Sequence, residues 1–155
     1  MNSRSIFVRP AALGAGTLLA VLLSTGAHAD DSAALAAAAK ETGAVKTDSG
    51  LVYKSVKEGS GASPTATDVV RVNYRGTFPD GKEFDASASH GGPAEFPLNR
   101  VIPCWTEGVQ KMKVGGQAKL TCPSTIAYGA RGAGGVIPPN ATLVFDVELV
   151  GIKGK

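Results

Sequence analysis

Histidine, cysteine and aromatic residues, which carry much of enzyme chemistry, are all scarce in this sequence. Of its 155 residues, two are histidine, two are cysteine and 6% are aromatic. No serine stands in a nucleophile elbow, no Cys/His pair is indicated, and no ligand spacing predicts a metal site. Beyond the N-terminal segment the one histidine is His90, which stands beside two glycines and is interpreted as an exposed loop residue. Familiar covalent or metal-dependent catalysis is therefore not predicted.

Charge of one sign is not in excess either. The net charge is +3, and two of the basic residues, Arg4 and Arg9, lie in a segment that we expect to be removed. Without them 14 basic and 13 acidic residues remain, a net charge of +1. A nucleic-acid site needs clustered basic residues, whereas the lysines here are scattered. We therefore expect no nucleic-acid partner.

The longest apolar run, Ala11–Leu23, is too short to cross a bilayer comfortably, which takes about 20 residues. It follows a stretch with two arginines and no acid, and it leads to the small-x-small pattern at Ala27–Ala29. These features predict a signal peptide over residues 1–29, cleaved before Asp30, and a periplasmic or secreted protein. No cysteine stands at the cleavage point, so no stable membrane anchor is expected. The alternative is a buried N-terminal helix.

Residues 30–50 are expected to form a short helix and a linker ahead of a single domain over 51–155. The alanine-rich stretch Ser32–Lys40 predicts the helix, with an N-cap at one of residues 30–32. Small and polar residues over Thr42–Gly50 indicate the linker.

From Leu51 onward the pattern changes to strands and turns. Alternation of apolar and polar residues predicts extended segments, and Pro79-Asp80-Gly81 is a typical turn. The segments expected to be extended are Leu51–Glu58, Val69–Thr77, Glu83–Ala86, Glu95–Leu98, Gln117–Cys122 and Thr142–Ile152. Trp105, Val109 and Met112 form one apolar helix face, and Gly115-Gly116 would end that helix. The fold class is therefore α+β, with about five mostly antiparallel, twisted strands wrapped on one short helix.

Cys104 and Cys122 are predicted to form a disulfide. They are not a C-x-x-C pair, which argues against a thiol oxidoreductase, and export would place them in an oxidising compartment. A helix from Cys104 to Val114 rises about 15 Å, and a strand over residues 117–122 returns about 17 Å. The two cysteines should therefore finish at the same level. Two free buried thiols are the alternative.

A set of aromatic and branched aliphatic residues stands near the predicted turns. Composition alone does not decide whether they form a core or an apolar pocket. The set comprises Tyr74, Phe84, Phe96, Val101, Ile102, Trp105, Tyr128, Ile137 and Phe145.

Several runs that contain these residues resemble the FKBP-type peptidyl-prolyl cis/trans isomerases, in order and without a large gap from Leu51 to Ile152. Val69–Gly76 and Asp80–Asp85 are similar to the opening hairpin of that family. Val101–Val109 is similar to its pocket-floor helix, and Ala127–Gly129 and Val136–Leu149 resemble its closing loop and last strand. Several motifs at family spacing are far more specific than one short pattern.

The resemblance implies an apolar pocket that accelerates rotation about X-Pro bonds without a cofactor. Asp85 and Tyr128 are the implied catalytic residues, and the Ile102 N–H and Tyr128 hydroxyl would bind the peptide. The implied substrate-binding residues are Tyr74, Phe84, Phe96, Val101, Ile102, Trp105, Val136, Ile137 and Phe145. Ala133 and Val136 depart from the best-known human member, which has histidine and isoleucine there.

The implied partners are proline-containing segments of unfolded or folding proteins, and macrolide inhibitors of the rapamycin type. Family members with a long N-terminal helix dimerise through it, whereas only Ser32–Lys40 is available here, so the chain is expected to be a monomer. With no histidine among the implied pocket residues, the rate should be nearly independent of pH from about 6 to 8. The alternative function is a catalytically weak chaperone of the same fold that binds proline segments.

Overall fold

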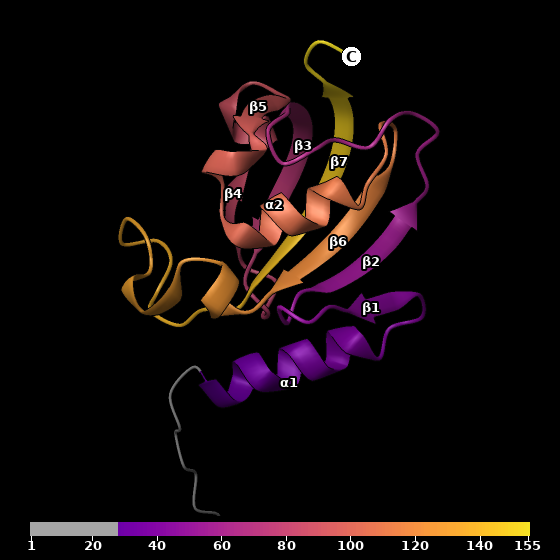
Figure 1. Cartoon of the computed structure of the whole chain (residues 1–155). Coiled ribbons are helices and arrows are strands. Elements are labelled where there is room, and N and C mark those ends of the chain that lie inside the picture. Colours follow the sequence, from indigo (N-terminus) through magenta and orange to yellow (C-terminus); the bar gives the residue numbers. More distant parts are fainter. Residues whose placement is uncertain (1–27) are drawn as a thin grey trace, which may run out of the picture.

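The computed structural model describes residues 28–155, in which a twisted antiparallel sheet wraps around a short helix (Figure 1). The predicted signal peptide therefore lies outside the described residues, apart from its last two. The strand order is β1-β2-β6-β7-β3-β4, and β5 also pairs with β3. The strands are β1 Ala44–Lys46, β2 Val52–Lys57, β3 Val69–Thr77, β4 Glu83–Ala86, β5 Ala94–Pro97, β6 Gln117–Cys122 and β7 Leu143–Ile152. Every neighbouring pair is antiparallel, which confirms the α+β class.

Helix α2, Pro103–Gln110, lies across the inner face of this sheet (Figure 1). Proline at its first position suits a helix start, because that N–H would have no partner within the helix. Trp105 and Val109 are buried on α2, as the predicted apolar face requires, whereas Met112 is buried beyond the end of the helix. Gly108 permits the close approach to β6, since a Cβ there would lie 2.8 Å from the Leu120 side chain.

The end of α2 differs from the prediction. The helix ends at Gln110 rather than at Gly115-Gly116, and Met112 lies beyond it. The reason is competition from the sheet: the Gly115 amide donates to the Leu149 carbonyl at 2.8 Å, and the Leu149 amide donates to Gly116 at 3.0 Å. A chain that pairs with β7 in this way cannot continue as a helix.

The N-terminal segment is also more structured than expected. Helix α1, His28–Ala39, begins four residues before the predicted start, so the N-cap prediction at residues 30–32 is wrong. The expected linker contains β1, which pairs with β2. Ala38 is buried, and Glu41 accepts hydrogen bonds from Lys119 at 2.8 Å and Lys54 at 3.2 Å. These contacts attach the segment to the edge and outer face of the sheet.

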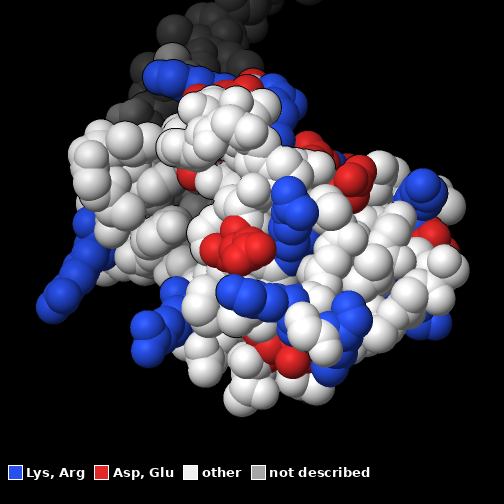
Figure 2. Space-filling model, turned by 90° about the horizontal axis from the view of Figure 1, so that it is seen from above, with Lys and Arg blue, Asp and Glu red and all other residues white. Residues whose placement is uncertain are grey.

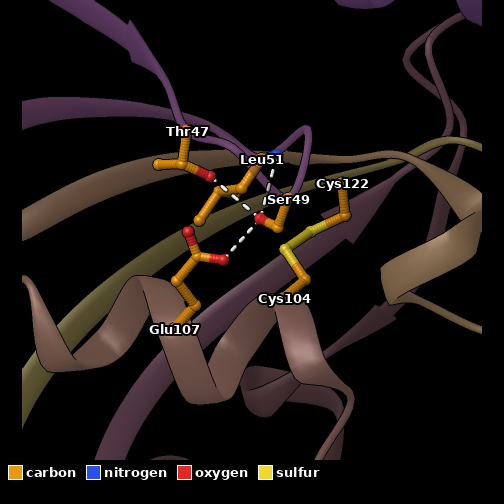
Figure 3. Close-up of a disulfide and its surroundings, with 6 residues drawn as sticks. All are labelled: Thr47, Ser49, Leu51, Cys104, Glu107 and Cys122. Carbon is orange, nitrogen blue, oxygen red and sulfur yellow. Dashed lines mark hydrogen bonds between the residues drawn. A yellow bond between two sulfur atoms is a disulfide. The ribbon is translucent and has the colours of Figure 1, made fainter.

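The Cys104–Cys122 disulfide is present, as predicted, and joins the start of α2 to the end of β6 (Figure 3). Both cysteines are fully buried, and their Cα atoms are 5.9 Å apart. Beside the bridge, Ser49 donates to the Glu107 carboxylate and so ties the loop before β2 to α2 (Figure 3). Helix α2 is therefore anchored covalently in its first turn and by a hydrogen bond in its second.

The surface seen from above carries basic and acidic side chains interspersed (Figure 2). Among the described residues, no helix has the length and apolar character needed to span a bilayer.

Candidate active site

The candidate site is an apolar cavity of about 450 Å³ between the start of α2 and strands β3, β4, β5 and β7. It brings together residues that are far apart in the sequence. The lining residues are Tyr74, Phe84, Asp85, Phe96, Arg100, Val101, Ile102, Trp105, Tyr128 and Phe145. Nine of these ten were singled out from the sequence, and Arg100 was not.

Trp105 stands at the centre of an aromatic cluster within this cavity. Its ring centroid lies 5.3 Å from Tyr74, 5.5 Å from Phe96 and 5.3 Å from Phe145, each at an interplanar angle of 78–89°. Edge-to-face contacts of this kind each contribute about 0.5–1.5 kcal/mol beyond area burial. The indole is buried, and its Nε1–H has no hydrogen-bond partner in residues 28–155. Unpaired buried donors are rare in native proteins outside strained or functional positions.

Glycine at position 76 makes room for two of the aromatic walls. A Cβ there would lie 2.5 Å from the Phe84 ring and 3.0 Å from the Phe145 ring. Those two rings lie edge to face, with centroids 5.6 Å apart. A side chain at Gly76 would therefore displace a wall of the cavity.

The polar side of the cavity is organised around the Asp85 carboxylate. Oδ2 accepts the Tyr74 hydroxyl at 2.8 Å, and Oδ1 accepts the Ala86 amide at 2.9 Å and lies 2.8 Å from His90 Nε2. Burial raises the pKa of Asp85, but the hydrogen bonds from Tyr74, His90 and Ala86 outweigh it, so the pKa lies below its ordinary value. Burial, followed by the bond to Asp85, raises the pKa of Tyr74 well above its ordinary value.

Besides the Trp105 indole N–H, two more hydrogen-bond donors at the cavity have no partner within the described chain. Tyr128 is 40% exposed and its hydroxyl makes no hydrogen bond among residues 28–155. Burial and the nearby Asp85 charge raise the pKa of Tyr128, which keeps it a donor at neutral pH. The Ile102 carbonyl accepts the amides of Trp105 and Thr106, while its own N–H has no partner in the described part of the chain. Both groups are free to bind a ligand.

Val136 and Ile137, which the resemblance implies as substrate-binding residues, are not among the residues that line this cavity. They line an adjacent hollow of about 620 Å³ beneath the closing loop. A tight turn explains their placement, because the Ala133 and Ile137 amides each donate to the carbonyl of the other at 3.0 Å. Ile137 is buried under this turn, and Val136 is 55% exposed.

Sequence reasoning missed two polar residues at the site. Arg100 directly precedes Val101, a predicted pocket residue, and this position next to it in the sequence could have indicated that Arg100 lies at the site. His90 was interpreted as an exposed loop residue; its side chain is 62% exposed, yet it contacts the Asp85 carboxylate. It does so because the 3₁₀ turn Ser87–His90 folds back beside β4.

A second hollow, of about 440 Å³, lies on the outer face of the sheet. Three of its polar side chains bond one another: Gln117 donates to Glu148 at 2.9 Å, and Asn73 donates to the same carboxylate at 3.4 Å. In residues 28–155 no group of three or more His, Cys, Asp or Glu side chains could hold a metal. The aromatic cavity, with its unpaired donors, is therefore the stronger candidate site.

The chain belongs to the FKBP-type peptidyl-prolyl cis-trans isomerase family, whose model matches residues 61–150. It is 58% identical over 119 residues to the FKBP-type peptidyl-prolyl cis-trans isomerase FkpA of Aeromonas hydrophila, covering 77% of this chain and 44% of that protein. It is 52% identical over 114 residues to the FKBP-type 22 kDa isomerase of Escherichia coli, covering 74% and 55%. The chain thus spans about half the length of the curated relatives it matches.

Solved structures show the same fold. The crystal structure of FkpA from Escherichia coli matches with a TM-score of 0.79 and 48% identity, over 82% of this chain and 59% of that chain. A peptidyl-prolyl cis-trans isomerase from Pseudomonas syringae matches with a TM-score of 0.76 and 36% identity, over 81% and 92%. The expected FKBP-like fold is therefore confirmed.

Proposed function

We propose that this chain is a peptidyl-prolyl cis/trans isomerase that accelerates rotation about X-Pro bonds in other proteins. The observation that carries the proposal is the cavity in which Tyr74, Phe96 and Phe145 stand edge-on around Trp105. An apolar cavity of about 450 Å³ is open enough to take a proline ring. Membership of the isomerase family supports the same reaction.

The proposed mechanism needs neither a nucleophile nor a general acid. Rotation about a peptide bond faces a barrier of about 18–20 kcal/mol because the twisted amide loses its resonance. The twisted amide is less zwitterionic than the planar one, so apolar walls favour it, and burial of the proline ring supplies binding energy. A site that binds the twisted form more tightly than the planar form accelerates the rotation.

The free donors suit this mechanism. The Ile102 N–H and the Tyr128 hydroxyl would hold the peptide backbone on either side of the rotating bond. Asp85, kept ionised by its hydrogen bonds, would fix Tyr74 as a wall and interact with polar groups of the substrate at the rim. A macrolide of the rapamycin type would occupy the same cavity and inhibit the reaction.

We further propose that the protein works outside the cytoplasm on unfolded or folding clients. The pattern over residues 1–29 supports a cleaved signal peptide, and the Cys104–Cys122 bridge suits an oxidising compartment. The mature chain would hold a short N-terminal segment, 30–50, and the isomerase domain, 51–155. A monomer is favoured because the N-terminal segment packs on its own sheet through Ala38 of α1 and through Glu41, which follows the helix. Intact mass of the exported protein tests the cleavage before Asp30.

The activity is tested by exchange of a proline tetrapeptide with the purified chain, with and without the macrolide. We expect macrolide-sensitive turnover, with kcat/KM lowered about fivefold in Tyr128→Phe, because one hydrogen bond contributes about 1 kcal/mol. Val150→Ala, on the outer face, is the control and should keep full activity. Binding of the peptide without turnover would instead favour the chaperone function, and neither binding nor turnover would refute both.

A further inference from the structure

His90 is fixed beside the cavity by the strand next to it. Ser87, three residues earlier in the same 3₁₀ turn, accepts the Tyr74 amide at 3.0 Å and donates to the Tyr74 carbonyl at 3.3 Å. The turn is thereby attached to β3 at the residue that forms a wall of the cavity. This attachment places His90 Nε2 2.8 Å from Asp85 Oδ1. The contact belongs to the folded cavity, although the imidazole itself is largely exposed.

The two oxygens of Asp85 connect His90 to the aromatic cluster. Oδ1 faces His90 and the Ala86 amide, and Oδ2 accepts the Tyr74 hydroxyl. Because the carboxylate is rigid and planar, holding Oδ1 also fixes the direction of Oδ2. The Tyr74 ring in turn lies edge-on to Trp105, with centroids 5.3 Å apart. The orientation of a cavity wall thus depends on the group that holds Oδ1.

We propose that His90 is a positioning residue of the isomerase site and that its protonation strengthens the hold on Asp85 and Tyr74. The proposal rests on the proposed function and adds a residue that acts through Asp85 without touching the substrate. It also replaces the expectation of a pH-independent rate, which assumed that no histidine adjoins the site.

The charges around His90 determine the direction of the effect. An imidazole changes its charge between pH 5 and 8. Asp85 stays ionised in that range, and the raised pKa values of Tyr74 and Tyr128 keep both protonated. Arg100, which also lines the cavity, stays cationic, and Glu83 on the same strand as Asp85 pairs with Arg75. The contact of His90 with Asp85 is therefore charge-assisted when the imidazole is protonated and a neutral hydrogen bond when the imidazole is neutral.

Charge-assisted hydrogen bonds are roughly twice as strong as neutral ones, and exposure reduces the difference. We therefore expect kcat/KM to fall about threefold between pH 5.5 and 8. The test measures kcat/KM on an uncharged proline tetrapeptide over this range, at constant ionic strength, for the wild type, His90→Arg and His90→Gln. His90→Arg should stay at the low-pH value throughout, and His90→Gln at the high-pH value. A flat wild-type profile, a slope of opposite sign, or a slope that both variants retain would overturn the proposal.

A second readout does not depend on turnover. With aspartate labelled by carbon-13 at the carboxyl, the Asp85 resonance should shift at the pH where His90 titrates in the wild type. The inflection should be absent from His90→Gln and His90→Arg, and Asp80, distant from His90 in the opening hairpin, serves as the internal control. No inflection at Asp85 would refute the contact itself. If no variant accelerates isomerisation, the proposed function fails and the positioning role fails with it, even where the carbon-13 shift reports the contact.

Discussion

The inner and outer faces of the sheet are built from different chemistry. On the inner face, residues such as Val72, Leu120 and Phe145 are buried against α2, and the disulfide lies in the same layer. On the outer face, Glu148 pairs across strands with Gln117 and Asn73. Glu41, in the turn between α1 and β1, also pairs with Lys54 and Lys119. The inner face therefore combines the core with the candidate site, because both need apolar surface removed from water. The side chains of the outer face remain in contact with water, so polar residues suffice there.

This comparison predicts how substitutions on the two faces should differ. Burial and cross-links carry energies of several kcal/mol, whereas partly exposed ion pairs contribute about 0–1 kcal/mol each.

Replacing Trp105 by Ala should have the largest effect, on both stability and activity. The substitution removes the centre of the aromatic cluster and leaves a cavity, so the free energy of unfolding should fall by about 3–5 kcal/mol. Urea denaturation measures this loss, with Val150→Ala on the outer face as the control, expected within about 0.5 kcal/mol. An equal loss of unfolding free energy in the two variants would contradict the difference between the inner and outer faces.

Loss of the disulfide should rank second. The bridge closes a loop between residues 18 apart, which corresponds to about 3 kcal/mol in the chain-entropy account. The double variant Cys104→Ala/Cys122→Ala should lose about this much in denaturant unfolding. The same denaturation with a reductant should lower the stability of the wild type and leave the variant unchanged. Two titratable thiols in the unfolded, unreduced wild type would show that the bridge does not form.

Glu41→Gln should have the smallest effect, below about 1 kcal/mol, because the pairs it breaks are about one-third exposed. Hydrogen bonds from Lys119 and Lys54 lower the pKa of Glu41 below its ordinary value of 4.5. A lowered folded-state pKa means that the stabilisation is present above pH 4.5 and is lost as the pH falls through the folded-state pKa.

The difference in unfolding free energy between wild type and Glu41→Gln should therefore vanish in acid. Thermal unfolding at pH 7 and pH 3 measures it, with Glu83→Gln as the matched control on the more exposed pair with Arg75. A difference that persists at pH 3 would assign Glu41 a role other than its charge.

The strands were predictable because their local pattern agrees with their final environment. Val69–Thr77, Glu83–Ala86 and Gln117–Cys122 were predicted with the bounds that the structure shows. The end of α2 was not predictable in the same way, because Gly115 and Gly116 pair with Leu149, a residue more than thirty positions later. The disulfide prediction was right although its assumed helix was too long, since the reversal still returns Cys122 to the level of Cys104.

The sequence by itself determined the family, the aromatic walls around Trp105 and the cysteine pair. Each of these depends on residue types and their spacing, which can be recognised in the sequence from local patterns and from the resemblance to a family. Only the tertiary structure decided that Val136 and Ile137 line the adjacent hollow, that Arg100 lines the cavity and that His90 contacts Asp85 at its polar side. The physical reason is that these placements depend on how turns fold back: the Ala133–Ile137 hydrogen bonds direct one turn away from the cavity, and the Ser87–Tyr74 bonds hold the other against it.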